Sequence, residues 1–153
     1  MVVAREEGIE TILAQGVFDV FHVGHLEYLT KSAEHGILFV GTESDESVKK
    51  NKSKKRPINN LNERLKLLAA LRCVDFAFGY EDILDYFNPD SFMERLLTLQ
   101  PDYLAISNLA TDEHSDGKKE QAAKAGITPL IIDDKKINSS TNIIEKLNIQ
   151  KKS

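Results

Sequence analysis

Five short apolar runs along this chain are separated by longer segments in which apolar residues recur at helical spacing. The run at residues 37–40 is continuous and lies between two glycines. Such a run is typical of a strand that is covered on both faces of a parallel sheet. We therefore predict strands at residues 11–14, 37–40, 74–80, 103–106 and 128–132.

The segments between these strands carry apolar stripes together with helix start and stop signals. Asn60 and Glu63 form a capping-box pattern ahead of one stripe, with asparagine in place of serine or threonine. Gly36 and Gly126 follow two other stripes and provide C-terminal stops. We predict helices at residues 23–34, 61–71, 92–99 and 117–125, and a last helix after residues 139–141.

Strands that alternate with helices predict an α/β domain with a mainly parallel sheet and right-handed crossovers. The 153 residues fit a single domain. We expect a Rossmann-like, doubly wound parallel sheet of about five strands, with residues 1–10 and 150–153 as flexible tails. Ligands of such sheets bind beyond the carboxyl ends of the strands, so the segments after the first, second and fifth strands are expected to meet at one crevice.

Composition and charge exclude several classes of protein. The formal net charge of -4 is unlike that of the strongly basic domains that bind nucleic acid. The single cysteine, Cys73, excludes an internal disulfide and a multi-cysteine metal site, and it fits a reducing compartment. No segment approaches the ~20 apolar residues that span a membrane, and the first residues lack the apolar core of a signal peptide. We expect a cytoplasmic protein with neither nucleic acid nor membrane as a partner.

The stretch from Gln15 to His25 is the strongest candidate for a binding site. It reads as a strand, a glycine turn and a helix start, with His22 and His25 at that start. A helix N-terminus presents unpaired N–H groups and the positive end of the macrodipole, which favour bound anions. The spacing of the histidines puts both on one side of the first turn, where they can donate hydrogen bonds. This pattern predicts a phosphate site.

The same residues resemble a known family. The stretch GVFDVFHVGHLEYL is similar to the extended HxGH signature of the cytidylyltransferase-like nucleotidyltransferases. Every defined position of that signature is filled, by Gly16, Phe18, Asp19, His22, Gly24, His25 and Leu29. Two further stretches, SVKKNKSKKRPINNLNERLKLLAALRCVDF and INSSTNIIEKL, resemble segments of the bacterial enzymes that adenylylate D-glycero-β-D-manno-heptose 1-phosphate. Glycerol-3-phosphate cytidylyltransferases and archaeal-type FAD synthetases share much of this pattern.

The resemblance implies a nucleotidyltransferase of the EC 2.7.7 type. An acceptor phosphate oxygen would attack the α-phosphorus of a nucleoside triphosphate, and pyrophosphate would leave. Catalysis then consists mostly of aligning two polyanions and neutralising developing charge. A Mg²⁺ ion is expected to enter bound through the triphosphate, with no direct side-chain ligand. Enzymes of this kind are often dimers, so a homodimer is the assembly to test.

The resemblance also assigns roles to individual residues. The predicted catalytic residues are His22, His25 and Lys49. The predicted nucleotide-binding residues are Gly16, Val17, Phe18, Asp19, Gly24, Arg64, Ser139, Ser140 and Thr141. The predicted ligands of the substrate phosphate are Lys49, Lys52 and Arg56.

Several of these assignments have a purely structural alternative. The histidines could cap the helix, although the full signature favours a role as phosphate donors. Arg64 lies beside an apolar stripe and could pair with an acidic neighbour instead of binding phosphate. The turn at residues 139–141 could cap the last helix and do no more. Asp19 is expected to orient its loop rather than to bind a metal ion.

Three departures from the family patterns bear on the substrate. Asp134 stands where the cytidylyltransferases carry an arginine, which counts against CTP. Residues 106–109 replace a Lys-Gly-Gly-Asp type stretch of the heptose enzymes, and Gln15 replaces a small polar residue or asparagine. We predict AMP transfer from ATP to a phosphorylated small molecule, with a sugar phosphate favoured. The alternatives are CMP transfer from CTP to glycerol 3-phosphate, AMP transfer to FMN, and a nucleotide-binding regulatory protein without turnover.

Overall fold

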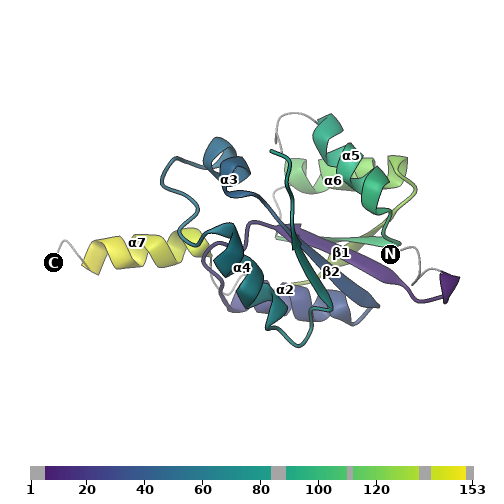
Figure 1. Ribbon diagram of the computed structural model, residues 1–153, viewed down its shortest axis with the longest axis horizontal. Coiled ribbons are helices and arrows are strands. Elements are labelled where there is room, and N and C mark those ends of the chain that lie inside the picture. Colours follow the sequence, from purple (N-terminus) through teal and green to yellow (C-terminus); the bar gives the residue numbers. More distant parts are fainter. Residues whose placement is uncertain (1–5, 84–88, 110–111, 135–138, 151–153) are drawn as a thin grey trace.

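A computed structural model of the protein describes residues 6–83, 89–109, 112–134 and 139–150 (Figure 1). Its single sheet has five parallel strands in the order β3-β2-β1-β4-β5. The strands are β1 (Thr11–Gly16), β2 (Ile37–Thr42), β3 (Phe76–Gly79), β4 (Tyr103–Ser107) and β5 (Thr128–Ile132). The predicted doubly wound parallel sheet is confirmed, and its strand order reverses between β1 and β4, where such sheets form a crevice.

Helices cover both faces of this sheet (Figure 1). One layer holds α2 (Val23–Ala33) and α4 (Leu61–Ala69), and the other holds α5 (Pro89–Leu99) and α6 (Asp112–Lys124). The short α3 (Asp45–Asn51) follows β2, and α7 (Ser140–Gln150) projects from the body of the protein. Two helical layers explain why the run of the central strand β1 is continuously apolar, because its first four residues are buried between them.

Alternate side chains of β1 belong to the two halves of the core. Ile12 packs in a cluster with Leu29 of α2 and Leu68 of α4. Leu13, one residue on, packs in a second cluster with Leu96 of α5. All five leucines and isoleucines named here are fully buried. The central strand therefore anchors both helical layers and fixes the position of the turn that follows it.

Two predicted boundaries are wrong for local physical reasons. β2 continues through Gly41, which pairs with Gln15 in register, whereas we expected Gly41 to end the strand. A Cβ atom at Gly41 would lie 2.6 Å from the ring of Tyr80, so the glycine makes room for that ring instead of breaking the strand. α6 begins at Asp112 rather than at residue 117. The capping box of Asn60 and Glu63 is present at the start of α4, as predicted.

The helix α3 is absent from the sequence prediction. Ser44 caps its N-terminus by accepting a hydrogen bond from the backbone N–H of Ser47. At the other end of the chain, α7 extends to Gln150, where we expected a tail to begin. Residues 1–5 and 151–153 of the predicted tails lie outside the described residues. No helix in the described ranges is long and apolar enough to cross a membrane.

Candidate active site

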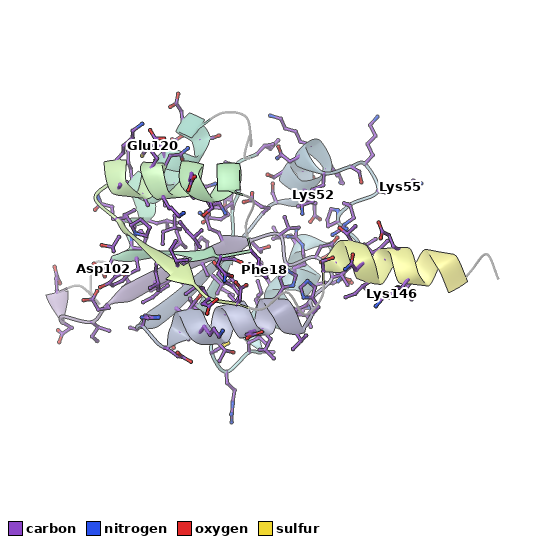
Figure 2. All side chains as sticks on the ribbon, turned by 180° about the vertical axis from the view of Figure 1, so that it is seen from behind. Phe18, Lys52, Lys55, Asp102, Glu120 and Lys146 are labelled. Atoms are coloured by element: carbon purple, nitrogen blue, oxygen red, sulfur yellow. The ribbon has the colours of Figure 1, made fainter. Side chains whose placement is uncertain are left out.

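An open cavity of about 280 Å³ lies at the carboxyl ends of β1 and β4. Six of the predicted site residues line it: Gly16, Val17, Phe18, His22, Gly24 and His25. The remaining lining residues are Gln15, Tyr28, Ala105, Ile106, Ser107, Leu109, Lys118 and Asp134. Figure 2 shows Phe18 and Lys52 toward the end of the sheet from which α7 projects, with Asp102 toward the other end.

The turn after β1 is shaped by the contact between Gly16 and Phe18. Phe18 adopts a positive φ of 49° and buries its ring, leaving 4% of the residue exposed. A Cβ atom at Gly16 would lie 3.1 Å from that ring, closer than ordinary contact. The glycine of the motif is therefore needed for the packing of the phenylalanine, in addition to any approach of a ligand to the backbone.

The two motif histidines form a stacked pair at the start of α2. Their ring centroids lie 3.8 Å apart with an angle of 20° between the planes, and the ring of Phe18 meets His25 edge-on. His22 occupies the N-cap position, but its side chain makes no capping hydrogen bond. The Nδ1 atoms of both rings are buried and have no hydrogen-bond partner among the described residues. Both rings therefore line the cavity with an unpaired nitrogen, and their contact with a ligand stays a prediction.

The surroundings of the pair disfavour the protonated form of both imidazoles. Burial lowers the pKa of His25 to about 4, and the neighbouring His22 and Lys52 act in the same direction. Burial also lowers the pKa of His22. A bound anion would raise both pKa values, because an opposite charge favours the protonated form. The rings are thus suited to gain hydrogen-bonding protons when a polyphosphate arrives.

Asp19 organises the segment that leads into α4. Its Oδ1 atom accepts hydrogen bonds from the backbone N–H groups of Ile58 and Asn59, at 2.7 and 2.8 Å. Its Oδ2 atom accepts from Nε of Arg56. Asp19 is 1% exposed and is not among the residues that line the cavity. This geometry agrees with the expectation that Asp19 orients its loop, and it engages the Arg56 guanidinium that we predicted to bind phosphate.

Arg64 is fully buried and its guanidinium is held by four hydrogen bonds. One joins Nη2 to Oδ1 of Asp45 at 2.6 Å, and another joins Nη1 to the backbone oxygen of Val17 at 2.8 Å. The other two reach the Thr42 hydroxyl and the Asn59 carbonyl. Asp45 is therefore the acidic neighbour with which Arg64 pairs in the structural alternative. The predicted phosphate contact stays a prediction, and the geometry favours a role in holding the motif turn.

The predicted lysines extend from the end of α3. Lys49 belongs to the last turn of that helix and is exposed. Lys52 lies close enough to His25 and Asp19 for their charges to interact. Burial, followed by the charge of Arg56, lowers the pKa of Lys52. Neither lysine lines the cavity described above, so their contact with a substrate phosphate stays a prediction.

The turn at residues 139–141 touches the motif loop from the far end of the sequence. The hydroxyl of Ser140 donates to the backbone oxygen of Val20 at 3.1 Å. The Ser139 hydroxyl accepts a hydrogen bond from the backbone N–H of Asn142, which caps α7. Thr141 is exposed. The capping role is therefore present, and a contact of this turn with phosphate stays a prediction.

The sequence did not assign a role to four polar residues in the cavity wall. The Ser107 hydroxyl donates to both carboxylate oxygens of Asp134, at 2.9 and 3.0 Å, and this contact ties the exits of β4 and β5 together. Gln15 and Lys118 complete the set. Gln15, Ser107 and Asp134 had a signal in the sequence, because each belongs to a departure from the family patterns. Lys118 had no such signal, since nothing in the sequence distinguishes it from the neighbouring Lys119.

The donors around the cavity suit an oxygen-rich anionic ligand. They comprise the imidazole pair, the start of α2, an ammonium group and an amide. Among the described residues, no group of three or more His, Cys, Asp or Glu side chains could hold a metal ion. Both carboxylate oxygens of Asp19 already accept hydrogen bonds. The expected entry of Mg²⁺ bound through the triphosphate stays a prediction.

Comparison with known sequences agrees with the geometry. The profile of the cytidylyltransferase-like family matches residues 13–146. The chain is 37% identical over 146 residues to the bifunctional protein HldE of Geotalea uraniireducens (strain Rf4), covering 94% of this chain and 28% of that protein. It is 33% identical over 150 residues to the bifunctional protein HldE of Escherichia coli O1:K1 / APEC, covering 97% of this chain and 30% of that protein. The chain thus spans less than a third of the length of these relatives.

Solved structures give the same picture of the fold. The lipopolysaccharide core biosynthesis protein from Thermoplasma volcanium GSS1 superposes with a TM-score of 0.65 and 29% identity, over 84% of this chain and 99% of that chain. Pantoate-beta-alanine ligase from Francisella tularensis, solved with beta-gamma ATP and beta-alanine, superposes with a TM-score of 0.63 over 95% of this chain and 71% of that chain. Its identity is 15%, so this second likeness concerns the fold alone.

Proposed function

Because the chain belongs to the cytidylyltransferase-like family, we propose that it transfers AMP from ATP to a sugar phosphate with release of pyrophosphate. The observation that carries this proposal is the stacked pair of His22 and His25, which opens onto the cavity at the start of α2. A helix start with two unpaired imidazole nitrogens is a site for polyphosphate. The likeness to two HldE proteins, together with the resemblance of residues 47–76 and 137–147 to heptose 1-phosphate adenylyltransferases, favours an adenylyltransferase that acts on a heptose 1-phosphate.

The proposed reaction is a single in-line displacement at the α-phosphorus. An acceptor phosphate oxygen forms the new P–O bond, and the bond to the bridging oxygen of the β-phosphate breaks, so that pyrophosphate leaves. His22 and His25 donate hydrogen bonds to the triphosphate, where negative charge grows in the transition state. The N–H groups at the start of α2 add the positive end of the helix dipole. No side chain needs to form a covalent intermediate, because the acceptor phosphate is already an anionic nucleophile.

Three further points of the proposal concern cofactor, base and assembly. A Mg²⁺ ion carried by the triphosphate would neutralise part of its charge. ATP is favoured over CTP by the likeness to HldE and by Asp134, which stands where the cytidylyltransferases carry an arginine. A homodimer and a cytoplasmic location stay predictions of the sequence.

Pyrophosphate release tests the proposal directly. The purified protein is given Mg²⁺ with ATP or CTP, together with each member of an acceptor panel. The panel holds D-glycero-β-D-manno-heptose 1-phosphate, glucose 1-phosphate, glycerol 3-phosphate and FMN. We expect release with ATP and a sugar 1-phosphate, and a far lower rate with CTP. Nucleotide binding without release for any acceptor would contradict the proposal and favour a regulatory protein.

A further inference from the structure

Gln15 presents an unused donor to the cavity. It lies near the end of β1, one residue before the motif glycine, and lines the cavity. Its Oε1 atom accepts a hydrogen bond of 2.8 Å from the Tyr80 hydroxyl. Its Nε2 atom is buried and has no hydrogen-bond partner among the described residues. A buried amide without a partner costs free energy, which a ligand oxygen would recover.

The surroundings of Tyr80 hold this amide in place. The ring of Tyr80 lies over Gly41, where a Cβ atom would come within 2.6 Å of it. The guanidinium of Arg95 lies 3.7 Å from the ring centroid on the face of that ring. Burial raises the pKa of the Tyr80 hydroxyl, which therefore stays protonated and donates to Gln15. With Oε1 accepting from Tyr80, the NH₂ group of Gln15 is left for a ligand.

Lys118 supplies a second unused donor from α6. It lines the same cavity, and burial lowers the pKa of its ammonium group. The charge of Glu43 acts in the opposite direction and raises this pKa. Within the described part of the chain, no carboxylate lies at ion-pair distance from Lys118. A partly desolvated ammonium without an anionic partner is stabilised by an anion that enters its pocket.

The carboxylate of Glu43 is already occupied by other groups. Nη1 and Nη2 of Arg95 donate to its two oxygens at 2.8 and 3.1 Å, and the Ser47 hydroxyl donates at 3.1 Å. Glu43 therefore does not need Lys118 to balance its charge. The backbone N–H of Glu43 bonds to the Gly16 oxygen, which places this cluster beside the end of β1 and hence beside Gln15.

From these contacts we infer that Gln15 and Lys118 form the subsite that receives oxygen atoms of the phosphorylated acceptor and sets its affinity. The histidine pair lies at the start of α2, in one helical layer, whereas Lys118 comes from α6 in the other layer (Figure 1). The cavity spans the two layers at the end of β1. If the triphosphate lies against α2, as the proposed function requires, the half near α6 is left for the second substrate. The inference rests on that function.

Substitutions at the two donors test the subsite. Lys118→Met removes the charge and keeps the length of the side chain. Gln15→Glu keeps an oxygen for the Tyr80 hydroxyl and replaces the free NH₂ group with a second oxygen, which repels an anion. Lys119→Met is the matched control, because Lys119 is the next residue of α6 and is ion-paired with Asp116 on the surface. Circular dichroism and thermal unfolding show which variants are folded.

The readout is the KM for each substrate in the pyrophosphate assay, with the best acceptor of the panel. We expect Lys118→Met and Gln15→Glu to raise the acceptor KM by about tenfold or more, the loss typical of a charge-assisted hydrogen bond. The KM for ATP should stay within about twofold of the wild-type value, as for a residue outside the nucleotide site. Lys119→Met should match the wild type. An unchanged acceptor KM, or an equal rise in the KM for ATP, would overturn the subsite.

A second measurement separates failure of the subsite from failure of the proposed function. If the wild-type protein releases no pyrophosphate, calorimetry measures binding of heptose 1-phosphate in the presence of α,β-methylene-ATP. Weaker heptose 1-phosphate binding in both variants, with nucleotide binding unchanged, supports the subsite although turnover is lost. Equal binding in wild type and variants overturns the subsite, and so does a lack of binding to all of them.

Discussion

The imidazole of His25 shows how strongly the fold acts on a single side chain. Burial and the nearby His22 and Lys52 lower its pKa from 6.5 to about 4. In the unfolded chain these influences are absent, so the same residue titrates near 6.5. As the pH falls from 6.5 toward 4, the unfolded chain takes up a proton that the folded protein does not. The free energy of unfolding therefore decreases as the pH is lowered from 6.5 to 4.

This linkage predicts the behaviour of a glutamine variant at position 25. His25→Gln should lose less thermal stability than the wild type when the pH is lowered from 6.5 to 4. Thermal midpoints of both proteins at several pH values measure the difference. Carboxylates titrate over the same pH range in both proteins, so their effect on stability largely cancels in this comparison. His35→Gln, at an exposed position, should follow the wild type. Equal slopes for wild type and His25→Gln would contradict the lowered pKa.

At the scale of residues, the sequence could identify the motif half of the site and not the other half. His22, Gly24 and His25 follow one another within a single turn, so a local pattern was enough to predict that they share a surface. Lys118 reaches the cavity only because α6 packs beside the exit of β4. Its neighbour Lys119 carries the same charge and lies on the surface. Periodicity in this polar helix does not separate the two.

At the scale of elements, the contact between α3 and α4 explains the position of Arg64. Asp45 begins α3 and meets the Arg64 guanidinium, which also holds the Val17 backbone oxygen of the motif turn. Removing a buried member of such a network leaves several acceptors unpaired. Arg64→Met should therefore lower the free energy of unfolding by about 3–5 kcal/mol. Chemical denaturation measures this change.

The matched control for Arg64 is Arg72→Met, since Arg72 is exposed shortly after the end of α4. That variant should change the free energy of unfolding by less than about 0.5 kcal/mol. One result at Arg64 would support the prediction from the sequence that this residue binds phosphate. If Arg64→Met keeps its stability but loses affinity for ATP, the guanidinium is a direct phosphate ligand.

The elements that the sequence predicted are those whose pattern follows burial. The run at β4 is apolar because its central residues are buried between the helical layers, and the positions of β4 and β5 were both found to within a residue. α3 was missed because only Ser47 and Val48 of its seven residues are buried, too few to form a stripe. Without α3, Asp45 could not be identified from the sequence as the acidic partner of Arg64. The missed helix and the favoured phosphate role of Arg64 thus have one cause.

At the scale of the whole molecule, the expected route of the metal ion makes a prediction about stability. The described residues hold no cluster of side chains suited to a metal ion. If Mg²⁺ enters only with the triphosphate, as proposed, EDTA should leave the thermal midpoint of the free protein unchanged. ATP with Mg²⁺ at a hundred times its dissociation constant should add about 2.7 kcal/mol of stability, and EDTA should remove most of that gain. AMP, which has no β- and γ-phosphates, serves as the control.

A fall in the thermal midpoint on addition of EDTA to the nucleotide-free protein would contradict this account. It would mean that the protein itself holds a metal ion that contributes to its folded state. A gain from ATP that persists in EDTA would show instead that the protein donors bind the triphosphate without the ion.

The central claim is that His22 and His25 stabilise the transition state of nucleotidyl transfer, and the most direct test compares three variants in the pyrophosphate assay. His22→Ala and His25→Ala should each lower kcat by about a hundredfold or more, as losses of transition-state donors do. Their far-UV circular dichroism should stay that of the wild type. His35→Ala, which changes an exposed histidine after α2, should keep wild-type activity. Turnover near the wild-type rate in both motif variants would contradict the claim.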